Sequence, residues 1–211
     1  MGEGGLLGIT NSKRVKNIVI FAIILIACTS SCGSIPKLIV LHDPLTADEH
    51  ITLGLSYEQK GEYDFAVQEY KKAIKITDAD FRPFFYAGNV YYKIKDYKLS
   101  EKYYNKALKI APDSGDIHNN LAWVYIDTGK YEDAGKEADK ALRLKKSPYY
   151  LDTLAHIYYH MGKYKEAMDA LTEAIAMTPE DDKELRENEN KMKGMLDEII
   201  NSRDKSFKSD P

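Results

Sequence analysis

The chain has 211 residues, of which 30% are charged and 44% are hydrophobic, and its formal net charge is −3. This length and composition allow an ordinary globular core, and the charge balance excludes a strongly basic nucleic-acid-binding protein. Both of its two cysteines precede residue 33, so the rest of the chain is expected to fold without a disulfide.

The first segment, residues 1–27, is predicted to be a signal peptide for export. The basic stretch KRVK at residues 13–16 precedes the apolar run IVIFAIILIA at residues 18–27. This run is about half of the ~20 residues that a membrane-spanning helix requires. A positive flank followed by a short apolar core is typical of secretory signals. An uncleaved short signal anchor is the alternative, and the length of the run disfavours it.

The end of this segment resembles the lipobox of bacterial lipoproteins, in which a cysteine is lipidated and becomes the first residue of the mature chain. The matching sequence is LIAC, ending at Cys28, and Cys32 is a second, weaker candidate. The resemblance implies a lipid anchor in a bacterial cell envelope. Lipoproteins retained in the inner membrane carry aspartate where this chain has Thr29, so an outer-membrane location facing the periplasm is expected.

Residues 28–46 are predicted to be a tether between the anchor and the first folded element. Thr46 and Glu49 have the spacing of a capping box at the start of a helix. The apolar run KLIVL at residues 37–41 is unusual for a linker. It is expected either to pack on the folded part as a strand-like flap or to lie near the lipid surface.

Next, the chain repeats one pattern four times. The sequence GEYDFA at residue 61 returns as KDYKLS at residue 95, GKYEDA at residue 129 and GKYKEA at residue 162. A fixed period of 33 or 34 residues indicates stacked supersecondary units. The four units are residues 47–80, 81–114, 115–147 and 148–181.

Each unit predicts two helices joined by a turn. Small or apolar residues at unit positions 4, 7, 8 and 11, and again at 17, 20, 24 and 27, give each helix one buried stripe. Glycine follows the first helix in three units and suits a positive φ, whereas Lys95 stands there in the second unit, so a strained turn is expected. Tyrosine occupies positions 11 and 17 of every unit: Tyr57, Tyr63, Tyr91, Tyr97, Tyr125, Tyr131, Tyr158 and Tyr164.

These residues resemble the tetratricopeptide repeat family, whose 34-residue unit is a helical hairpin. The resemblance covers residues 47–181 and implies an all-α fold, a right-handed α-solenoid of four hairpins with a concave groove. The junction HDPLTADEHITLGLSYEQKGEYDFA at residues 42–66 also resembles the tetratricopeptide tail of bacterial papain-like peptidases of the bacteriocin-processing type. This chain would then correspond to the tail without the enzyme.

After the fourth unit, residues 182–203 predict a capping helix, and residues 204–211 a disordered polar tail. A helix here would cover the last apolar face of the solenoid. The apolar residues that share one side of this helix are Leu185, Met192, Met195, Leu196, Ile199 and Ile200.

Motif spacing predicts no catalytic site, cofactor or metal. His156 and His160 are four residues apart, as in helical metal sites, and Asp152 lies one turn earlier. The metalloprotease motif requires glutamate directly after the first histidine, but Ile157 stands there. Surface or groove histidines are therefore favoured, and the chain is predicted to be non-enzymatic.

The family resemblance implies that the concave groove carries the function. Positions 2, 5, 9, 12 and 13 of each first helix line this groove in the family, and aromatic side chains rimmed by polar groups suit peptide recognition. Trp123, the only tryptophan, is predicted to be a binding anchor, and its alternative is a core position under the flap. The candidate groove residues are Phe85, Asn89, Tyr92, Asn119, Trp123, Tyr149, Asp152, His156 and Tyr159.

Together these features predict a membrane-anchored lipoprotein that acts as a scaffold by binding a protein or peptide partner. The alternative is a self-associating lipoprotein, a homo-oligomer that assembles an envelope machine of the pilus or secretin type. No basic stripe is visible along the helices, so nucleic acid is not an expected partner.

Overall fold

The structure is a computed structural model that describes residues 43–208, with side chains described through residue 202. Several predicted features lie outside the described residues: the signal peptide at residues 1–27, Cys28, Cys32 and the flap at residues 37–41.

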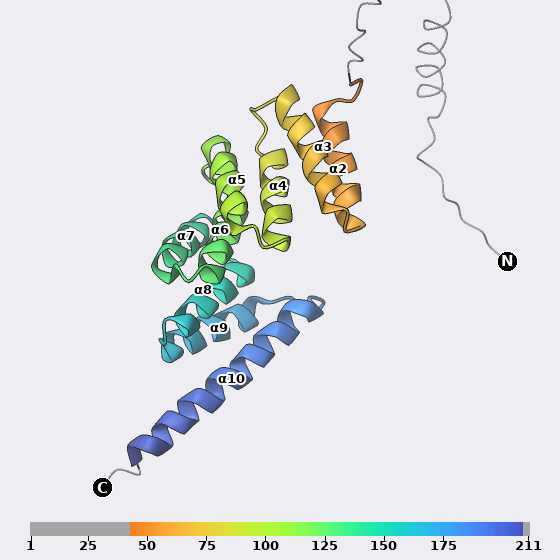
Figure 1. Cartoon of the computed structure of the whole chain (residues 1–211). Coiled ribbons are helices and arrows are strands. Elements are labelled where there is room, and N and C mark those ends of the chain that lie inside the picture. Colours follow the sequence, from red (N-terminus) through yellow and green to blue (C-terminus); the bar gives the residue numbers. More distant parts are fainter. Residues whose placement is uncertain (1–42, 209–211) are drawn as a thin grey trace, which may run out of the picture. The chain divides into compact units, whose positions relative to one another are not determined.

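All regular secondary structure within residues 43–208 is α-helical (Figure 1). Four helical hairpins follow one another, and a longer helix ends the series, which confirms the predicted all-α, right-handed solenoid with a final helix. The helices are α2 (Ala47–Gln59), α3 (Tyr63–Ile76), α4 (Arg82–Lys93), α5 (Tyr97–Ile110), α6 (Gly115–Asp127), α7 (Tyr131–Leu144), α8 (Pro148–His160), α9 (Tyr164–Met177) and α10 (Lys183–Lys208).

The hairpins stack in chain order (Figure 1). The second helix of each hairpin packs on the first helix of the next, and the first helices α2, α4, α6 and α8 also contact one another in series. These four helices form what we call the inner face of the stack. Because they share a face, side chains distant in sequence are aligned along it.

Helix α2 begins at the predicted capping box. The Thr46 hydroxyl accepts a hydrogen bond from the Glu49 N–H at 3.3 Å, and the Glu49 carboxylate accepts one from the Thr46 N–H at 2.8 Å. Two backbone donors that a helix start leaves unpaired are thereby satisfied. This fixes the first residue of the stack close to Ala47.

Every hairpin turns through a residue with positive φ. The angle is 76° at Gly61, 74° at Gly129 and 73° at Gly162, and it is 62° at Lys95. In all four turns a backbone N–H donates to the carbonyl of the position-11 tyrosine, five residues earlier, at 2.8–2.9 Å. This is the 6→1 hydrogen bond of a Schellman motif. The expected strain at Lys95 is confirmed, because this is a conformation that a residue with a Cβ adopts only at a cost.

The two helices of a hairpin approach closely where a small residue faces a buried ring. A Cβ added at Gly54 would lie 2.4 Å from Tyr70, and one added at Gly88 would lie 2.6 Å from Tyr104. Both tyrosines are buried, with 0% and 1% exposed. In the last two units alanine takes the glycine position and a smaller side chain replaces the ring, as Ala122 with Ala138 and Ala155 with Leu171.

Two units contain a histidine–glutamate pair, buried in the first unit and partly buried in the third, that motif spacing does not predict. His50 Nδ1 lies 2.6 Å from Glu69 Oε2, and His118 Nδ1 lies 2.6 Å from Glu137 Oε2. Both pairs join unit positions 4 and 23. The second and fourth units have largely apolar residues there, Phe84 with Tyr103 and Leu151 with Ala170. Buried polar groups require partners, so each histidine occurs with its glutamate.

The final helix, α10, packs against α9 and ends the stack (Figure 1). The Asp182 carboxylate accepts a hydrogen bond from the Leu185 N–H at 3.1 Å at its start. Met192 and Leu196 lie in one buried cluster with Leu171 of α9. The helix extends to Lys208, beyond the predicted end at residue 203, because residues 201–208 contain no proline or glycine to stop it.

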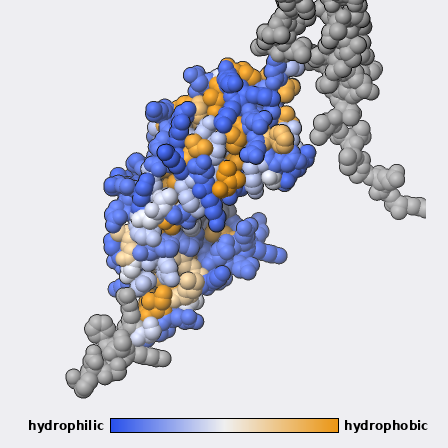
Figure 2. Space-filling model, viewed as in Figure 1, coloured by the Kyte–Doolittle hydropathy of each residue, from blue (hydrophilic) through white to orange (hydrophobic). Residues whose placement is uncertain are grey.

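The face of the stack seen in Figure 2 is mainly hydrophilic. Figure 2 shows one face, on which hydrophobic residues gather in small patches among hydrophilic ones. Among residues 43–208, no helix is both long enough and apolar enough to span a membrane.

Candidate ligand-binding groove

The inner face contains two hollows that share Trp123 of α6. The first, which we call the proximal hollow, has a volume of about 220 Å³ and is lined by Glu58, Asn89, Tyr92, Lys93, Tyr104, Asn120 and Trp123. The second, the distal hollow, has a volume of about 530 Å³ and is lined by Trp123, Asp152, His156, Tyr159, His160, Asn188, Lys191, Met192 and Met195.

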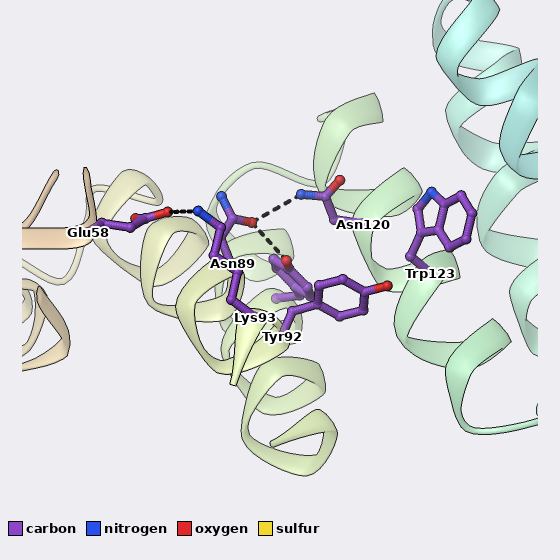
Figure 3. A pocket seen from close by; sticks show the side chains of 7 residues that line it. Glu58, Asn89, Tyr92, Lys93, Asn120 and Trp123 are labelled. Carbon is purple, nitrogen blue, oxygen red and sulfur yellow. Dashed lines mark hydrogen bonds and ion pairs between the residues drawn. The ribbon is translucent and has the colours of Figure 1, made fainter. Parts of the chain in front are cut away.

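The proximal hollow has a polar wall whose side chains hold one another in place (Figure 3). Oδ1 of Asn89 accepts hydrogen bonds from the Tyr104 hydroxyl at 2.7 Å and from the Asn120 amide at 3.0 Å. The Lys93 ammonium donates to Glu58 of α2 at 2.6 Å. Because two donors fix the Asn89 amide, its NH₂ group is oriented before any ligand arrives.

Tyr92 adds a neutral hydroxyl to this wall. Burial, together with the Asp127 carboxylate, raises the pKa of Tyr92 well above its usual value. The phenol is therefore un-ionised near neutral pH and retains its hydrogen-bonding proton. Its ring packs against Tyr97 with centroids 5.8 Å apart, which fixes the ring.

The distal hollow has aromatic walls. The Trp123 and His156 rings have centroids 5.0 Å apart and are tilted by 56°. His160 stacks on Tyr131 at 5.2 Å with nearly parallel planes, and Tyr159 meets His160 edge-on at 5.5 Å. Aromatic faces carry partial negative charge and suit cations and apolar groups.

Two carboxyl groups lie beneath these walls. Asp152 is 8% exposed, its Oδ2 lies 3.8 Å from His156 Nε2, and its Oδ1 has no hydrogen-bond partner. Glu189 of α10 is 0% exposed; Oε1 accepts from the Thr178 hydroxyl at 2.7 Å, and Oε2 has no partner. Burial and the nearby Glu189 charge raise the pKa of Asp152 to about 6. Burial and His160 lower the pKa of His156 to about 4, so this imidazole is neutral at pH 7.

The structure brings most of the predicted groove residues together, but three lie elsewhere. Phe85 packs against Tyr104 with ring centroids 6.1 Å apart, and Asn119 is 9% exposed. Tyr149 is 52% exposed, and its hydroxyl donates to Asp182. The candidates that line a hollow are Asn89, Tyr92, Trp123, Asp152, His156 and Tyr159.

Some residues that line the hollows could not be predicted from the sequence. Asn120 lines the proximal hollow in place of its neighbour Asn119, one position off the expected register. Tyr104 reaches the same hollow from α5, a second helix. Met192 and Met195 fall on the apolar side predicted for the capping helix, so a signal for their packing was present. Their position in the distal hollow depends on how the chain turns between α9 and α10. The repeat pattern of the sequence does not predict that turn.

His156 and His160 have the spacing of a helical metal site. In the described part of the chain, no group of three or more histidine, cysteine, aspartate or glutamate side chains is arranged to hold a metal ion. His156, His160 and Asp152 therefore do not constitute such a group. All three line the distal hollow.

Stacked hairpins with a lined inner face define the class of solenoid proteins. Residues 54–95 match a family model described as "TPR repeat", and residues 84–147 and 148–181 match models described as "Tetratricopeptide repeat". These matches run from residue 54 to residue 181, more than half of the chain. The chain belongs to the tetratricopeptide repeat family.

Similar proteins have varied names. The human "Cell division cycle protein 16 homolog" is 27% identical over 140 residues, covering 62% of this chain and 23% of that protein. The wheat "Hsp70-Hsp90 organizing protein" is 39% identical over 56 residues, covering 26% of this chain and 10% of that protein. The chain thus spans less than a quarter of either relative.

Solved structures resemble the chain in fold. The crystal structure of MamA aligns with a TM-score of 0.60 at 18% identity, covering 82% of this chain and 96% of that chain. A second MamA structure aligns with a TM-score of 0.59 at 19% identity, covering 77% and 90%. At this identity the likeness shows a shared solenoid fold.

Proposed function

We propose that the chain is a non-enzymatic scaffold that binds a segment of a protein partner along its inner face. The observation that carries the proposal is that Trp123 lines both hollows. An extended or helical segment laid along α4, α6 and α8 would contact both hollows and place an apolar group against the indole. Aromatic anchors surrounded by polar groups are the usual centres of such interfaces.

The comparisons support this class of role. One relative is named for organizing two other proteins, and a solenoid of helical hairpins offers an extended surface for a partner. The tetratricopeptide fold is typically non-catalytic, which favours binding over chemistry.

Partner capture with matched aromatic variants tests the proposal. Tagged wild-type chain, Trp123→Ala and Phe65→Ala would each be used to capture proteins from the native cell envelope, quantified by mass spectrometry. Phe65 is a suitable control because it is an aromatic residue, 53% exposed, on the second helix α3. Trp123→Ala should weaken capture by ~2 kcal/mol or more, as anchors do, while Phe65→Ala should not.

Thermal unfolding of the same variants tests the alternative, in which Trp123 is a core residue that stabilises the fold. Its removal should leave unfolding cooperative, because the side chain is partly buried and packs at the edge of the cluster that contains Ala122 and Ile157. A large loss of stability with capture intact would place Trp123 in the core and contradict the anchor role.

We further propose that a lipid on Cys28 tethers the scaffold to the outer membrane, facing the periplasm. The LIAC sequence after a short apolar run supports this. Cys28→Ser should yield an unprocessed or soluble chain, whereas Cys32→Ser should remain in the membrane fraction. Loss of membrane retention in Cys32→Ser alone would identify Cys32 as the lipidated residue instead.

We also propose that the chain is related to the tails of bacteriocin-processing-type peptidases, with the scaffold acting apart from the enzyme. The junction sequence at residues 42–66 supports this relation.

The oligomeric state distinguishes the scaffold from the self-associating alternative. Size-exclusion chromatography with light scattering should give a monomer. A stable oligomer that Trp123→Ala dissociates would favour the self-associating assembly lipoprotein.

A further inference from the structure

We propose that the distal hollow receives a basic side chain, arginine or lysine, from the partner segment. The juxtaposition that points to it is a pair of buried carboxyl groups beneath an aromatic hollow. This inference rests on the proposed function, because it names the chemistry of the segment that the inner face binds.

The two carboxyl groups lack the partners that their burial requires. Asp152 lines the hollow at 8% exposure, and Glu189 is fully buried on the adjoining α10. Each has one oxygen without a hydrogen-bond partner. A buried, unsatisfied polar group destabilises the fold and calls for an explanation. A cationic donor entering the hollow would supply the countercharge for Asp152 and offset the repulsion between the carboxylates.

The walls suit the rest of a basic side chain. Trp123 and Tyr159 offer ring faces, which attract a guanidinium or ammonium group. Met192 and Met195 of α10 offer apolar surface for an alkyl stem. The volume of about 530 Å³ falls in the usual range for ligand sites.

The charges around the hollow favour a cation over an anion or a neutral chain. Lys191, the lysine among the lining residues, is exposed and can turn its flexible stem toward solvent. His156 is neutral at pH 7 because burial lowers its pKa, so it does not repel a cation. An acidic ligand would meet Asp152, and a neutral apolar one would leave both carboxyl groups unsatisfied.

The single tryptophan makes a direct test practical. In the full chain labelled with ¹⁵N, the Trp123 indole N–H is one resolved signal that reports on the hollow. The probes are N-acetyl-arginine methylamide, N-acetyl-lysine methylamide, the neutral N-acetyl-norleucine methylamide and N-acetyl-glutamate methylamide. Both cationic probes should shift the signal saturably. The affinity of the other two probes should be lower by about tenfold or more.

Charge-neutral variants locate the effect. Asp152→Asn should weaken binding of the arginine probe by about tenfold or more and leave the norleucine probe unchanged. Glu189→Gln retains a group that can accept from Thr178, and it should weaken the arginine probe less. Asp197→Asn is the control, because Asp197 is an exposed carboxylate on the same α10. It should leave all four probes unaffected.

Each outcome separates this inference from the proposed function. The inference is overturned if the arginine probe fails to bind, binds no better than norleucine, or binds equally well to Asp152→Asn. The scaffold proposal still holds in those cases if partner capture depends on Trp123. If the arginine probe binds through Asp152 but capture ignores Trp123, the hollow is a basic-group site and the scaffold proposal fails.

Discussion

Asp152 is held where its own charge is unfavourable. Raising the pKa of this carboxyl from about 4 in an unfolded chain to about 6 in the fold costs on the order of 2–3 kcal/mol at neutral pH. The carboxyl is buried and its Oδ1 has no hydrogen-bond partner. Packing in the free protein therefore does not explain why an ionisable residue stands at this position. A residue that lowers stability in the free protein is typical of a binding position.

Asp152→Asn should therefore stabilise the free protein at neutral pH. A carboxyl with a raised pKa contributes its full stability below about pH 4 and loses it as the pH rises through about 6. The two proteins should be equally stable near pH 4, and above pH 7 the variant should be more stable by ~2–3 kcal/mol, the cost of the raised pKa. Urea unfolding across this range measures the gap. A variant less stable than the wild type at pH 7 would contradict the prediction.

Neighbouring groups also titrate, so the comparison uses the difference between the two proteins. Burial lowers the pKa of His156 to about 4. The stability that this neutral imidazole contributes is lost as the pH falls through that value, whereas the contribution of Asp152 is lost as the pH rises. Burial raises the pKa of Glu189, in the same direction as for Asp152. These groups, with His160 and Lys191, are present in both proteins, so most of their contribution cancels.

At the scale of one turn, Lys95 is the exception among the four hairpins. The other turns have glycine at this position, with φ between 73° and 76°, and Lys95 adopts 62°. A left-handed conformation costs a residue with a Cβ ~1–2 kcal/mol. Glycine avoids this cost but has more freedom to lose on folding, by ~0.5–1 kcal/mol.

Lys95→Gly should stabilise the fold by ~0.5–1 kcal/mol, which is the difference between these two effects. Gly129→Lys places lysine in the equivalent turn and should destabilise by a similar amount. Thermal and urea unfolding measure both variants. If Lys95→Gly is neutral or destabilising, the lysine side chain makes a stabilising contact that offsets the strain.

Elements of this kind could largely be predicted from the sequence. The period, the glycines and the tyrosine columns define four helical hairpins, because each feature is local to one unit. The partly buried pair of His118 and Glu137 could not be predicted, since the two residues are 19 apart in sequence and meet only when the hairpin closes. The distal hollow was predictable in part: Trp123 and His156 lie on the inner face, but the wall from α10 depends on how the last helix packs.

At the scale of the whole stack, α10 covers the face that α9 would otherwise expose. In a solenoid each element contacts mainly its neighbours, so the last unit depends on its cap. Leu185, Met192 and Leu196 are buried on this helix at 8%, 5% and 0% exposure. Full burial of such a side chain contributes ~1.5–3 kcal/mol.

A chain that ends at residue 182 should therefore lose several kcal/mol of stability and associate through the uncovered face of α9. Thermal unfolding and light scattering measure the two effects. A chain that ends at Ile200 is the control, because it keeps all three buried side chains and should behave like the full chain. Equal stability of the two truncated chains would show that α10 does not cap the stack.

The helix that covers the last repeat is also a wall of the distal hollow. A side chain bound there would bridge α8 and α10, so binding energy would be added to the docking of the terminal helix. The exposed end of the stack is the part most open to fraying and to proteases. Partner occupancy would then lengthen the lifetime of the scaffold itself, and the amount of scaffold in the cell would follow the supply of its partner.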